Sequence, residues 1–335
     1  MISLEDYNKK NASYKKTMVF HFGAFAGFYS EYNNMLQAMA FCLVHKIRFK
    51  LYSKDAKFCP VNGWTDYFEP FAEEVDDEIH HLYNKRFPTD PYRTAFLGLF
   101  LKTKIMRMLG YKSRKVSFSF YDRFVRNWRI KRKYGFDFFT YNLWNDFRHI
   151  NITKKVRVGS VFRGTYFELI KNLDEMIWKF NIETKSKVDK FLLNTLLSEA
   201  FVGMHIRGGD KSIEAELIKW EKYTERATLD RPECRNWFIF TDDYSIVESI
   251  QNAYPQHKVY SLCDISERGY YYGEFAADKE KMVDKMIRMF ASVEICKKSD
   301  YFIGTASSNP YFVISLFKSG KNCVSLDIGN NYYVP

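Results

Sequence analysis

The feature that most constrains the fold is an alternation of short apolar strands and longer amphipathic helices after residue 200. Phe201 to Ile206 has the length and apolar character of a buried strand, and it opens the series. Further strands are predicted over 237–241, 258–262, 301–304 and 322–326, with helices over 214–227, 243–253, 278–298 and 309–318. Strands and helices alternating at these lengths favour a doubly wound parallel sheet.

A second, shorter unit of the same kind is predicted near the N-terminus. A strand over 17–22 is followed by the small-residue turn Gly23–Gly27, a helix with apolar positions between 35 and 43, and a strand over 47–52. Strand, turn, helix and strand make a βαβ unit, in which the strands pair in parallel.

The alternating pattern restarts after a predicted helix over 186–200, for which Ser186 is the expected N-cap. A chain of 335 residues is long enough for two α/β domains. We therefore expect an N-terminal α/β domain over 1–185 and a C-terminal Rossmann-like domain over 186–335.

Composition narrows the class of protein. The six cysteines are scattered with no C-x-x-C pair, which argues against a zinc site and a dense disulfide framework and favours a reducing cytosol. The N-terminus lacks the apolar core of a signal peptide, and no stretch approaches the ~18 apolar residues of a spanning helix. These features predict a cytoplasmic protein.

Charge is concentrated in a basic helical insertion predicted over about 100–135. Twelve Lys or Arg and a single acid, Asp122, lie between Lys102 and Tyr134, within a net charge of +11. The basic segment 102–133 has three interpretations: a solvated helical face, a peripheral contact with an anionic membrane or a lipid-linked acceptor, and nucleic-acid binding. No nucleic-acid module accompanies the charge, so no nucleic-acid partner is expected.

The sharpest motif is the run from His205 to Lys211, at the carboxyl end of a predicted buried strand. That end of a parallel sheet faces the ligand crevice. Arg207 offers a planar fork suited to phosphate, and Lys211 adds a mobile charge four residues later. The two cations could neutralise a diphosphate without a metal; the alternative is an ordinary surface turn rich in glycine and charge.

Two further motifs follow later strands. Asp242 and Asp243 could bind magnesium beside a phosphate, or cap the helix that begins at Asp243. Ser307 and Ser308 precede a helix, where hydroxyls and unpaired N–H groups bind anions or simply cap it. Because all three motifs follow strands of the same predicted sheet, we expect one crevice with a phosphate-sized anion site. That arrangement suits a transferase whose leaving group is a nucleoside diphosphate.

The same motifs resemble those of the α1,6-fucosyltransferases, a family that includes the core N-glycan and nodulation-factor enzymes. Val202 to Lys211 resembles the family's V-G-V-H-V-R-R-T-D-K, 241–243 its A-T-D-D segment, and 299–309 its aspartate-containing strand and T-F-S-S turn. The turn at Gly27 and the pair at 63–64 are similar but looser. The resemblance implies a GT-B-like fold of two Rossmann-type domains with a crevice between them.

The resemblance also implies an activity: an inverting, metal-independent glycosyltransferase that moves fucose from GDP-fucose to a glycan hydroxyl. No cofactor is implied beyond this donor substrate. The partners implied are the nucleotide sugar and an oligosaccharide or glycolipid acceptor, with the acceptor on the N-terminal domain. The alternatives are another nucleotide-sugar donor, or a non-catalytic protein that binds polyanions or membranes.

Roles carry over by motif position. Arg207 should clamp the donor β-phosphate, Lys211 should stabilise the departing GDP, and Glu214 is the expected base with Glu216 as the second choice. The expected donor-binding residues are His205 by the nucleoside, Arg207, Asp210 orienting its loop, Asp242, Ser307 and Ser308 at the phosphates, and Gly27.

Two positions depart from the family pattern. Gly208 replaces the second arginine of the motif, which implies a different grip on phosphate or acceptor. Ser292 stands where the family has an aspartate that contacts guanosine, which leaves the donor base open.

Overall fold

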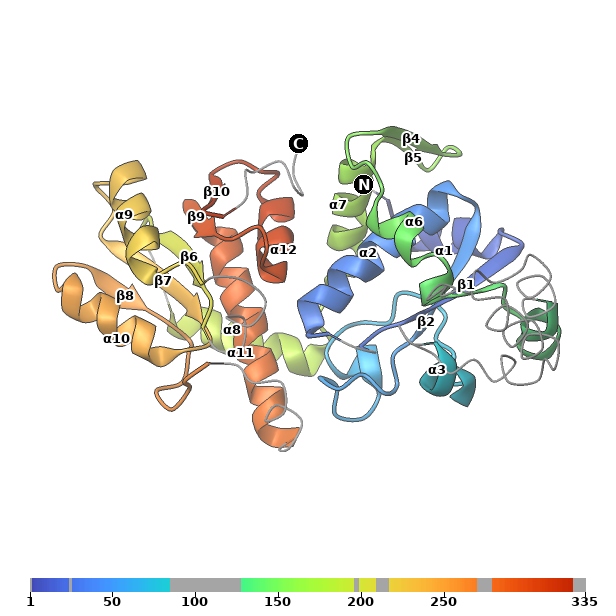
Figure 1. Cartoon of the computed structure of the whole chain (residues 1–335), viewed down its shortest axis with the longest axis horizontal. Helices are drawn as coiled ribbons and strands as arrows, with labels where there is room; N and C mark the ends of the chain where they lie inside the picture. Colours follow the sequence, from blue (N-terminus) through green and yellow to red (C-terminus); the bar gives the residue numbers. More distant parts are fainter. Residues whose placement is uncertain are drawn as a thin grey trace, which may run out of the picture.

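The computed structural model describes residues 2–23, 26–84, 128–195, 199–208, 217–269 and 279–327. The chain forms two α/β halves, each with its own parallel sheet, and helices pack between them (Figure 1). The predicted α/β fold class is therefore confirmed.

The N-terminal sheet has the order β2-β1-β3, with β1 (Lys16–His21) central between β2 (Ile47–Tyr52) and β3 (Phe138–Phe139). Both pairings are parallel. Helix α2 (Phe28–Val44) connects β1 to β2, as the sequence predicts. Most residues of α2 are buried, including several polar ones in its first half, because other elements cover the helix on several sides.

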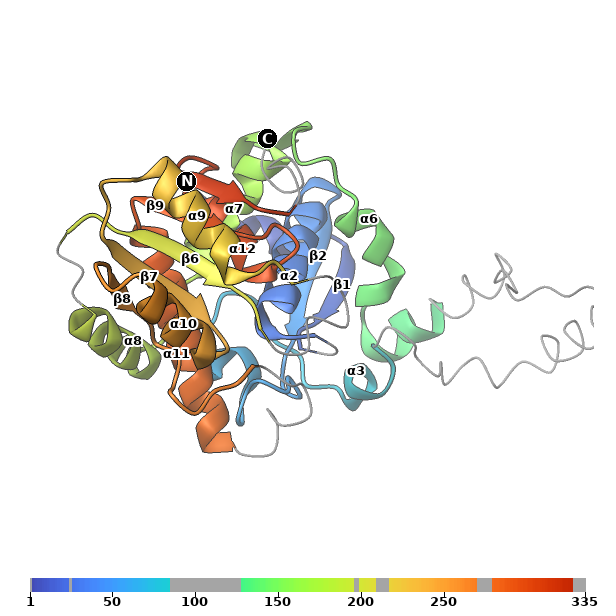
Figure 2. The ribbon, with the colours of Figure 1, turned by 60° about the vertical axis from the view of Figure 1, so that its left-hand side comes forward.

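The C-terminal sheet has five parallel strands in the order β10-β9-β6-β7-β8. The strands are β6 (Val202–Ile206), β7 (Asn236–Thr241), β8 (Lys258–Tyr260), β9 (Tyr301–Gly304) and β10 (Cys323–Ser325). The crossover helices are α9 (Trp220–Asp230), α10 (Tyr244–Ala253), α11 (Lys279–Lys298) and α12 (Asn309–Phe317). Helices α9 and α10 cover one face, and α11 and α12 cover the other (Figures 1 and 2).

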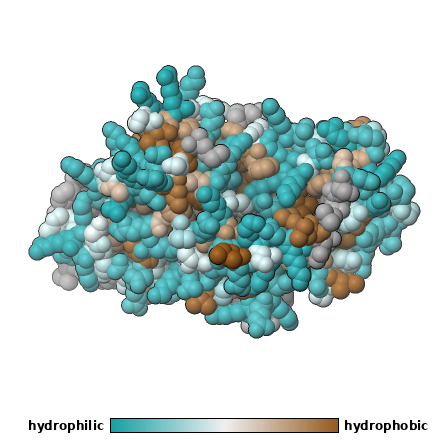
Figure 3. Space-filling model, turned by 180° about the vertical axis from the view of Figure 1, so that it is seen from behind, coloured by the Kyte–Doolittle hydropathy of each residue, from teal (hydrophilic) through white to brown (hydrophobic). Residues whose placement is uncertain are grey.

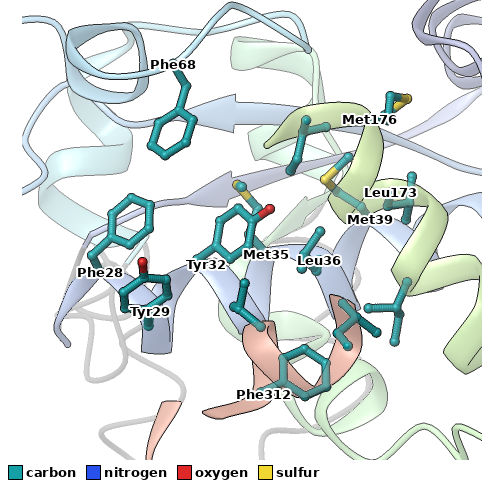
Figure 4. Close-up of a cluster of buried hydrophobic side chains, with 14 of the residues drawn as sticks. Phe28, Tyr29, Tyr32, Met35, Leu36, Met39, Phe68, Leu173, Met176 and Phe312 are labelled. Atoms are coloured by element: carbon teal, nitrogen blue, oxygen red, sulfur yellow. The ribbon is translucent and has the colours of Figure 1, made fainter. Parts of the chain in front are cut away.

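The two halves share one hydrophobic core. Helix α2 packs against α7 (Tyr166–Ile177) of its own half and against α12 of the other. Phe28 of α2 stacks edge-on against Phe290 of α11, with ring centroids 4.9 Å apart. Figure 4 shows side chains of α2, α7 and α12 meeting in this cluster. Burial of so many aromatic rings at one junction fixes the halves relative to each other.

Several N-terminal elements were not predicted. They are α1 (Leu4–Ala12), η1 (Gly63–Asp66), α3 (Glu78–Tyr83), η2 (Thr140–Asn142), α6 (Trp144–Arg148), the hairpin of β4 (Lys155–Val158) and β5 (Phe162–Thr165), and α7. One signal for α7 was present: Thr165 and Glu168 form a capping box at its start.

Two predicted helix starts are wrong. Helix α8 (Ile182–Asn194) begins before Ser186, because the Asn181 side chain caps it by accepting the Thr184 N–H at 2.8 Å. Helix α9 begins at Trp220 rather than at residue 214, since Lys219 has extended dihedrals. The division at 185 and 186 falls within α8 and stays a prediction.

The basic segment 102–133 lies almost wholly outside the described residues, so its interpretations stay open. Its described end includes Trp128, whose half-exposed ring lies 5.3 Å from the Arg132 guanidinium. Among the described helices, none is long and apolar enough to cross a membrane. Seen from behind, the surface is mostly hydrophilic, and its apolar patches are scattered (Figure 3).

Candidate nucleotide-sugar site

The strand order of the C-terminal sheet locates the candidate site. Along the chain, β6 is followed by β7 and β8 on one side, whereas β9 and β10 add to its other side. The order therefore reverses between β6 and β9. In doubly wound sheets, ligands bind outside the carboxyl ends of the strands at such a switch point. The motifs after β6 and β9, with Arg207 and Ser307, lie at this point.

His205, one residue before the end of β6, has a buried, neutral ring. It is 2% exposed and lies on the Phe240 ring of β7, with centroids 4.4 Å apart. Burial, and then the nearby charge of Arg207, lowers the pKa of His205 to about 3. Its Nδ1 has no hydrogen-bond partner in the described part of the chain. A buried nitrogen of this kind suits a polar ligand atom.

Arg207 leaves the strand toward Asp242 of the next turn. Its Nη2 lies 3.6 Å from Asp242 Oδ2, and both side chains are about one-quarter exposed. The other carboxylate oxygen, Oδ1, accepts the Gly208 N–H at 2.7 Å. Asp242 was predicted to bind the donor, and that role stays a prediction; in the structure its carboxylate lies against Arg207 and accepts from the turn after β6.

The turns after β6 and β7 approach each other so closely at position 208 that only glycine fits there. A Cβ built there would lie 2.9 Å from Asp243 Cβ and 3.4 Å from Asp242 Oδ1. Any side chain at 208 would force the β6 and β7 turns apart. The structure thus gives a steric reason for the missing second arginine.

The turn after β7 is also tied to the loop after β8. Asp243 caps α10, as predicted, because its Oδ1 accepts the Ser245 N–H at 2.9 Å. The Gly269 N–H donates to the Asp242 carbonyl at 2.8 Å. Three successive loops therefore meet at Asp242.

Sequence reasoning missed Glu267, which folds the β8 loop onto α11. Its carboxylate forms a bidentate pair with Arg288, at 3.0 and 3.1 Å. Burial raises the pKa of Glu267, but hydrogen bonds and charge from Arg288 outweigh it, so that the pKa lies below its usual range. No local pattern announces this pair, because its members are 21 residues apart.

The turn between β9 and α12 holds a carboxylate. Asp327 Oδ1 accepts the Ala306 N–H at 2.8 Å, and Oδ2 accepts the Ser307 N–H at 3.1 Å. Ser325 Oγ also donates to Asp327 Oδ1 at 2.6 Å. Ser307 is exposed and Ser308 is buried. The N–H groups of Ala306 and Ser307 thus bind an anion that the chain itself supplies, whereas the Ser308 N–H donates to the Thr305 carbonyl at 2.9 Å. The role of Ser307 and Ser308 at a phosphate stays a prediction.

Gly27 lies in the other half, at the N-cap of α2. Near it, the buried carboxylate of Glu31 accepts the N–H groups of Gly23 at 3.3 Å and Ala26 at 3.0 Å. Asn33 of α2 donates to the Asn309 carbonyl of α12 at 3.0 Å. This contact brings the first turns of α2 and α12 together across the junction.

Four predicted site residues fall outside the described residues: Asp210, Lys211, Glu214 and Glu216. Ser292 is described, and it is buried in α11 with its hydroxyl donating to the Arg288 carbonyl at 2.8 Å. It therefore offers nothing to a nucleotide base. Within the described ranges, no three His, Cys, Asp or Glu side chains converge to hold a metal ion.

Comparison with known proteins supports the resemblance. No protein-family model matches the chain. An α-(1,6)-fucosyltransferase of Caenorhabditis elegans is 28% identical over 144 residues, which are 39% of this chain. The match covers only 24% of that protein's length.

Solved structures match over nearly the whole chain. NodZ α-1,6-fucosyltransferase soaked with GDP-fucose has a TM-score of 0.50 at 10% identity, over 94% of this chain and 96% of that one. Fucosyltransferase NodZ from Bradyrhizobium has a TM-score of 0.51 at 10% identity, over 96% and 100%. The chain thus has the GT-B-like fold of NodZ, and the predicted resemblance to the α1,6-fucosyltransferases is confirmed.

Proposed function

We propose that the protein is a glycosyltransferase that moves fucose from GDP-fucose to a hydroxyl of a glycan acceptor. The observation that carries the proposal is the anion-binding turn after β9, a strand that neighbours β6, which Arg207 follows, at the switch point of the sheet. A diphosphate leaving group needs such a place. The NodZ fold and the 144-residue match support fucose and GDP as the donor groups.

The reaction is an inverting displacement at the anomeric carbon. The acceptor oxygen forms a bond to that carbon as the bond to the β-phosphate oxygen breaks, and the acceptor proton passes to a base. The resemblance assigns the base to Glu214, with Glu216 as the second choice. Charge developing on GDP is met by Arg207, Lys211 and the Ser307–Ser308 turn.

The donor site needs no metal in this proposal. Two cations and the backbone amides of Ala306 and Ser307 together supply the positive charge that a diphosphate requires. His205 lies beside the nucleoside and stays neutral, so it contributes a hydrogen bond rather than a charge. Gly27 approaches the donor from the other half.

A second donor class is favoured by one observation. Ser292 is buried and cannot contact a base, so the guanine contact that the family makes there is missing. Another nucleotide sugar of the same fold is therefore the second candidate. The acceptor is an oligosaccharide or glycolipid on the N-terminal half, and contact of the basic segment 102–133 with an anionic membrane belongs to the same proposal.

Calorimetric titration with GDP, with UDP as the comparison and EDTA present, tests the proposal. We expect GDP to bind in EDTA and to lose most of its affinity in Arg207→Ala. Binding of UDP in place of GDP would keep the site and change the donor. Failure of every nucleotide to bind would overturn the proposed function.

A further inference from the structure

A chain of three titratable side chains lies at the carboxyl end of β1, in the half opposite the donor site. His21 Nε2 lies 2.6 Å from Asp55 Oδ1, and His81 Nδ1 lies 2.6 Å from Asp55 Oδ2. The His21 side chain is fully buried, Asp55 is 23% exposed and His81 is 51% exposed. The chain thus runs from the core to the surface.

The hydrogen-bond partners decide where the protons lie. His21 Nδ1 faces the Asn84 carbonyl at 2.7 Å, and a carbonyl only accepts, so Nδ1 carries a proton. The short contact between His21 Nε2 and Asp55 needs a second proton. Burial raises the pKa of Asp55, but hydrogen bonds and charge from His21 and His81 bring it below its usual range. Asp55 is therefore a carboxylate, and both histidines contact it.

This arrangement fixes the surface histidine. Both oxygens of Asp55 are engaged, so His81 must donate from Nδ1, and its Nε2 is left as a hydrogen-bond acceptor that faces solvent. A ring nitrogen held in a fixed direction at the surface matches a hydroxyl group.

Asn84, whose carbonyl contacts His21, is held in place by further hydrogen bonds. Asn84, which follows α3, donates from Nδ2 to the Val19 carbonyl at 2.9 Å, and its Oδ1 accepts the Thr140 N–H at 2.9 Å. These bonds fasten the end of α3 to β1 and η2. A binding group held by packed secondary structure keeps its direction without the ligand.

The segment after β2 connects this place to the other half. Ala56 lies against Gly23 so closely that a Cβ on that glycine would be 2.4 Å from Ala56 Cβ. Four residues later, the Pro60 carbonyl accepts from Lys279 of α11 at 3.1 Å. Figures 1 and 2 show this segment beside the end of α11. The segment that begins at Asp55 thus contacts both the β1–α2 turn and α11 of the other half.

We propose that His81, oriented by Asp55 and His21, binds a hydroxyl of a neutral saccharide acceptor. The inference rests on the proposed function, because it names the acceptor-side contact of the same reaction. His81 Nε2 accepts a hydrogen bond from the sugar hydroxyl and fixes the acceptor beside the donor. Proton removal from the reacting hydroxyl is left to the base.

Steady-state kinetics with GDP-fucose as donor and N,N′-diacetylchitobiose as the acceptor probe test the proposal. His81→Phe keeps a ring but loses the nitrogen, and His81→Gln restores an acceptor oxygen. We expect the acceptor KM to rise about 10-fold in His81→Phe, the loss of one neutral hydrogen bond, with kcat within about twofold. His81→Gln should recover most of the loss. The matched control is His149→Phe, at an exposed histidine outside the cluster.

GDP titration of each variant separates the two proposals. Unchanged GDP affinity with a raised acceptor KM supports the hydroxyl contact. An acceptor KM in His81→Phe equal to that of His149→Phe overturns it, as does a fall in kcat alone, which would indicate proton transfer. Wild-type protein that binds GDP but does not transfer to the probe also overturns it. Wild-type protein that does not bind GDP overturns the proposed function instead.

Discussion

Two strand-to-helix turns in this protein bind a carboxylate of the chain itself, and they differ in where that carboxylate comes from. At the start of α2, Glu31 accepts N–H groups from residues at most eight positions away. At the start of α12, Asp327 accepts N–H groups from residues 20 and 21 positions away. Glu31 is 2% exposed, whereas Asp327 is exposed.

The difference indicates at which of the two turns a donor phosphate can replace the carboxylate. Glu31 is fixed by its own helix and by burial, so removing it would leave buried amides unsatisfied. Asp327 follows the last strand and is exposed to solvent, so a phosphate from solution can reach the N–H groups that it binds. We infer that the α12 turn receives the donor diphosphate, whereas the carboxylate of Glu31 stays in place at the α2 turn.

The largest expected effect is on the rate of fucosyl transfer, and it comes from Arg207 at the proposed donor site. Arg207→Ala should lower kcat for fucosyl transfer by about 10²–10³, or roughly 2.7–4 kcal/mol, if Arg207 resembles other preorganised donors to a developing anion. Initial rates of GDP release measure it, with Arg163→Ala at an exposed arginine of β5 as the control. Near-normal kcat in Arg207→Ala would contradict the assignment of the site.

Lowering the pH should reduce the free energy of unfolding, because each half of the protein contains one buried histidine that stays neutral. The pKa of His80 and that of His205 are each lowered to about 3, chiefly by burial. The unfolded chain takes up protons below about 6.5 that the folded chain does not, so the free energy of unfolding falls as pH drops from about 6.5 toward 3. At pH 5 the loss is about 2 kcal/mol for each histidine.

Urea unfolding at pH 7, 6 and 5 checks this expectation. His205→Asn should reduce the pH dependence by about half of the histidine contribution. Stability that is constant between pH 7 and 5 would show that neither ring is held neutral. The experiment also separates general acid unfolding from effects at either turn.

Glu31→Gln should damage stability and spare nucleotide binding. The neutral amide is a weaker acceptor for the two N–H groups, so the free energy of unfolding should fall by about 1–3 kcal/mol. Urea unfolding measures the loss, with the exposed Glu5→Gln as the control. A large fall in GDP affinity with normal stability would make the α2 turn part of the donor site.

Asp327→Asn is the matched change at the α12 turn, and its effect, on the Kd for GDP, should be the smallest of the effects predicted for these variants. Removing the competing charge should lower the Kd for GDP by about 3- to 10-fold, on the order of 1 kcal/mol. Calorimetry measures it against Asp189→Asn, at an exposed residue of α8. Weaker GDP binding in Asp327→Asn would show that the carboxylate belongs to the bound state and is not displaced.

Much of the C-terminal half could be predicted from the sequence. Strands buried on both faces are continuous apolar runs, so β6, β7 and β9 were predicted within a residue of their observed bounds. The start of α10 was also predicted, since Asp243 is a short-range cap. Helix α8 was predicted to start too late, because Ser186 resembles an N-cap although Asn181 is the cap that is used. Helix α9 was predicted to start too early, at Glu214, whereas it begins at Trp220.

The N-terminal half was predicted less completely. Its two-residue strand β3 and the β4–β5 hairpin are too short to show a period, and they form only because β1 and α7 give them a surface. The carried-over roles of Lys211, Asp210 and Glu214 stay predictions, since these residues lie outside the described residues.

The sequence by itself determined the parallel sheet, the order of its motifs and the presence of cations and hydroxyls at the strand ends, because periodicity and local turn chemistry are short-range properties. Only the tertiary structure decided that Asp242 binds Arg207, that Asp327 binds the α12 turn, and that His81 is oriented through Asp55. Each of these contacts joins residues 20 or more positions apart, and such pairs are set by how the helices and strands pack rather than by any local pattern.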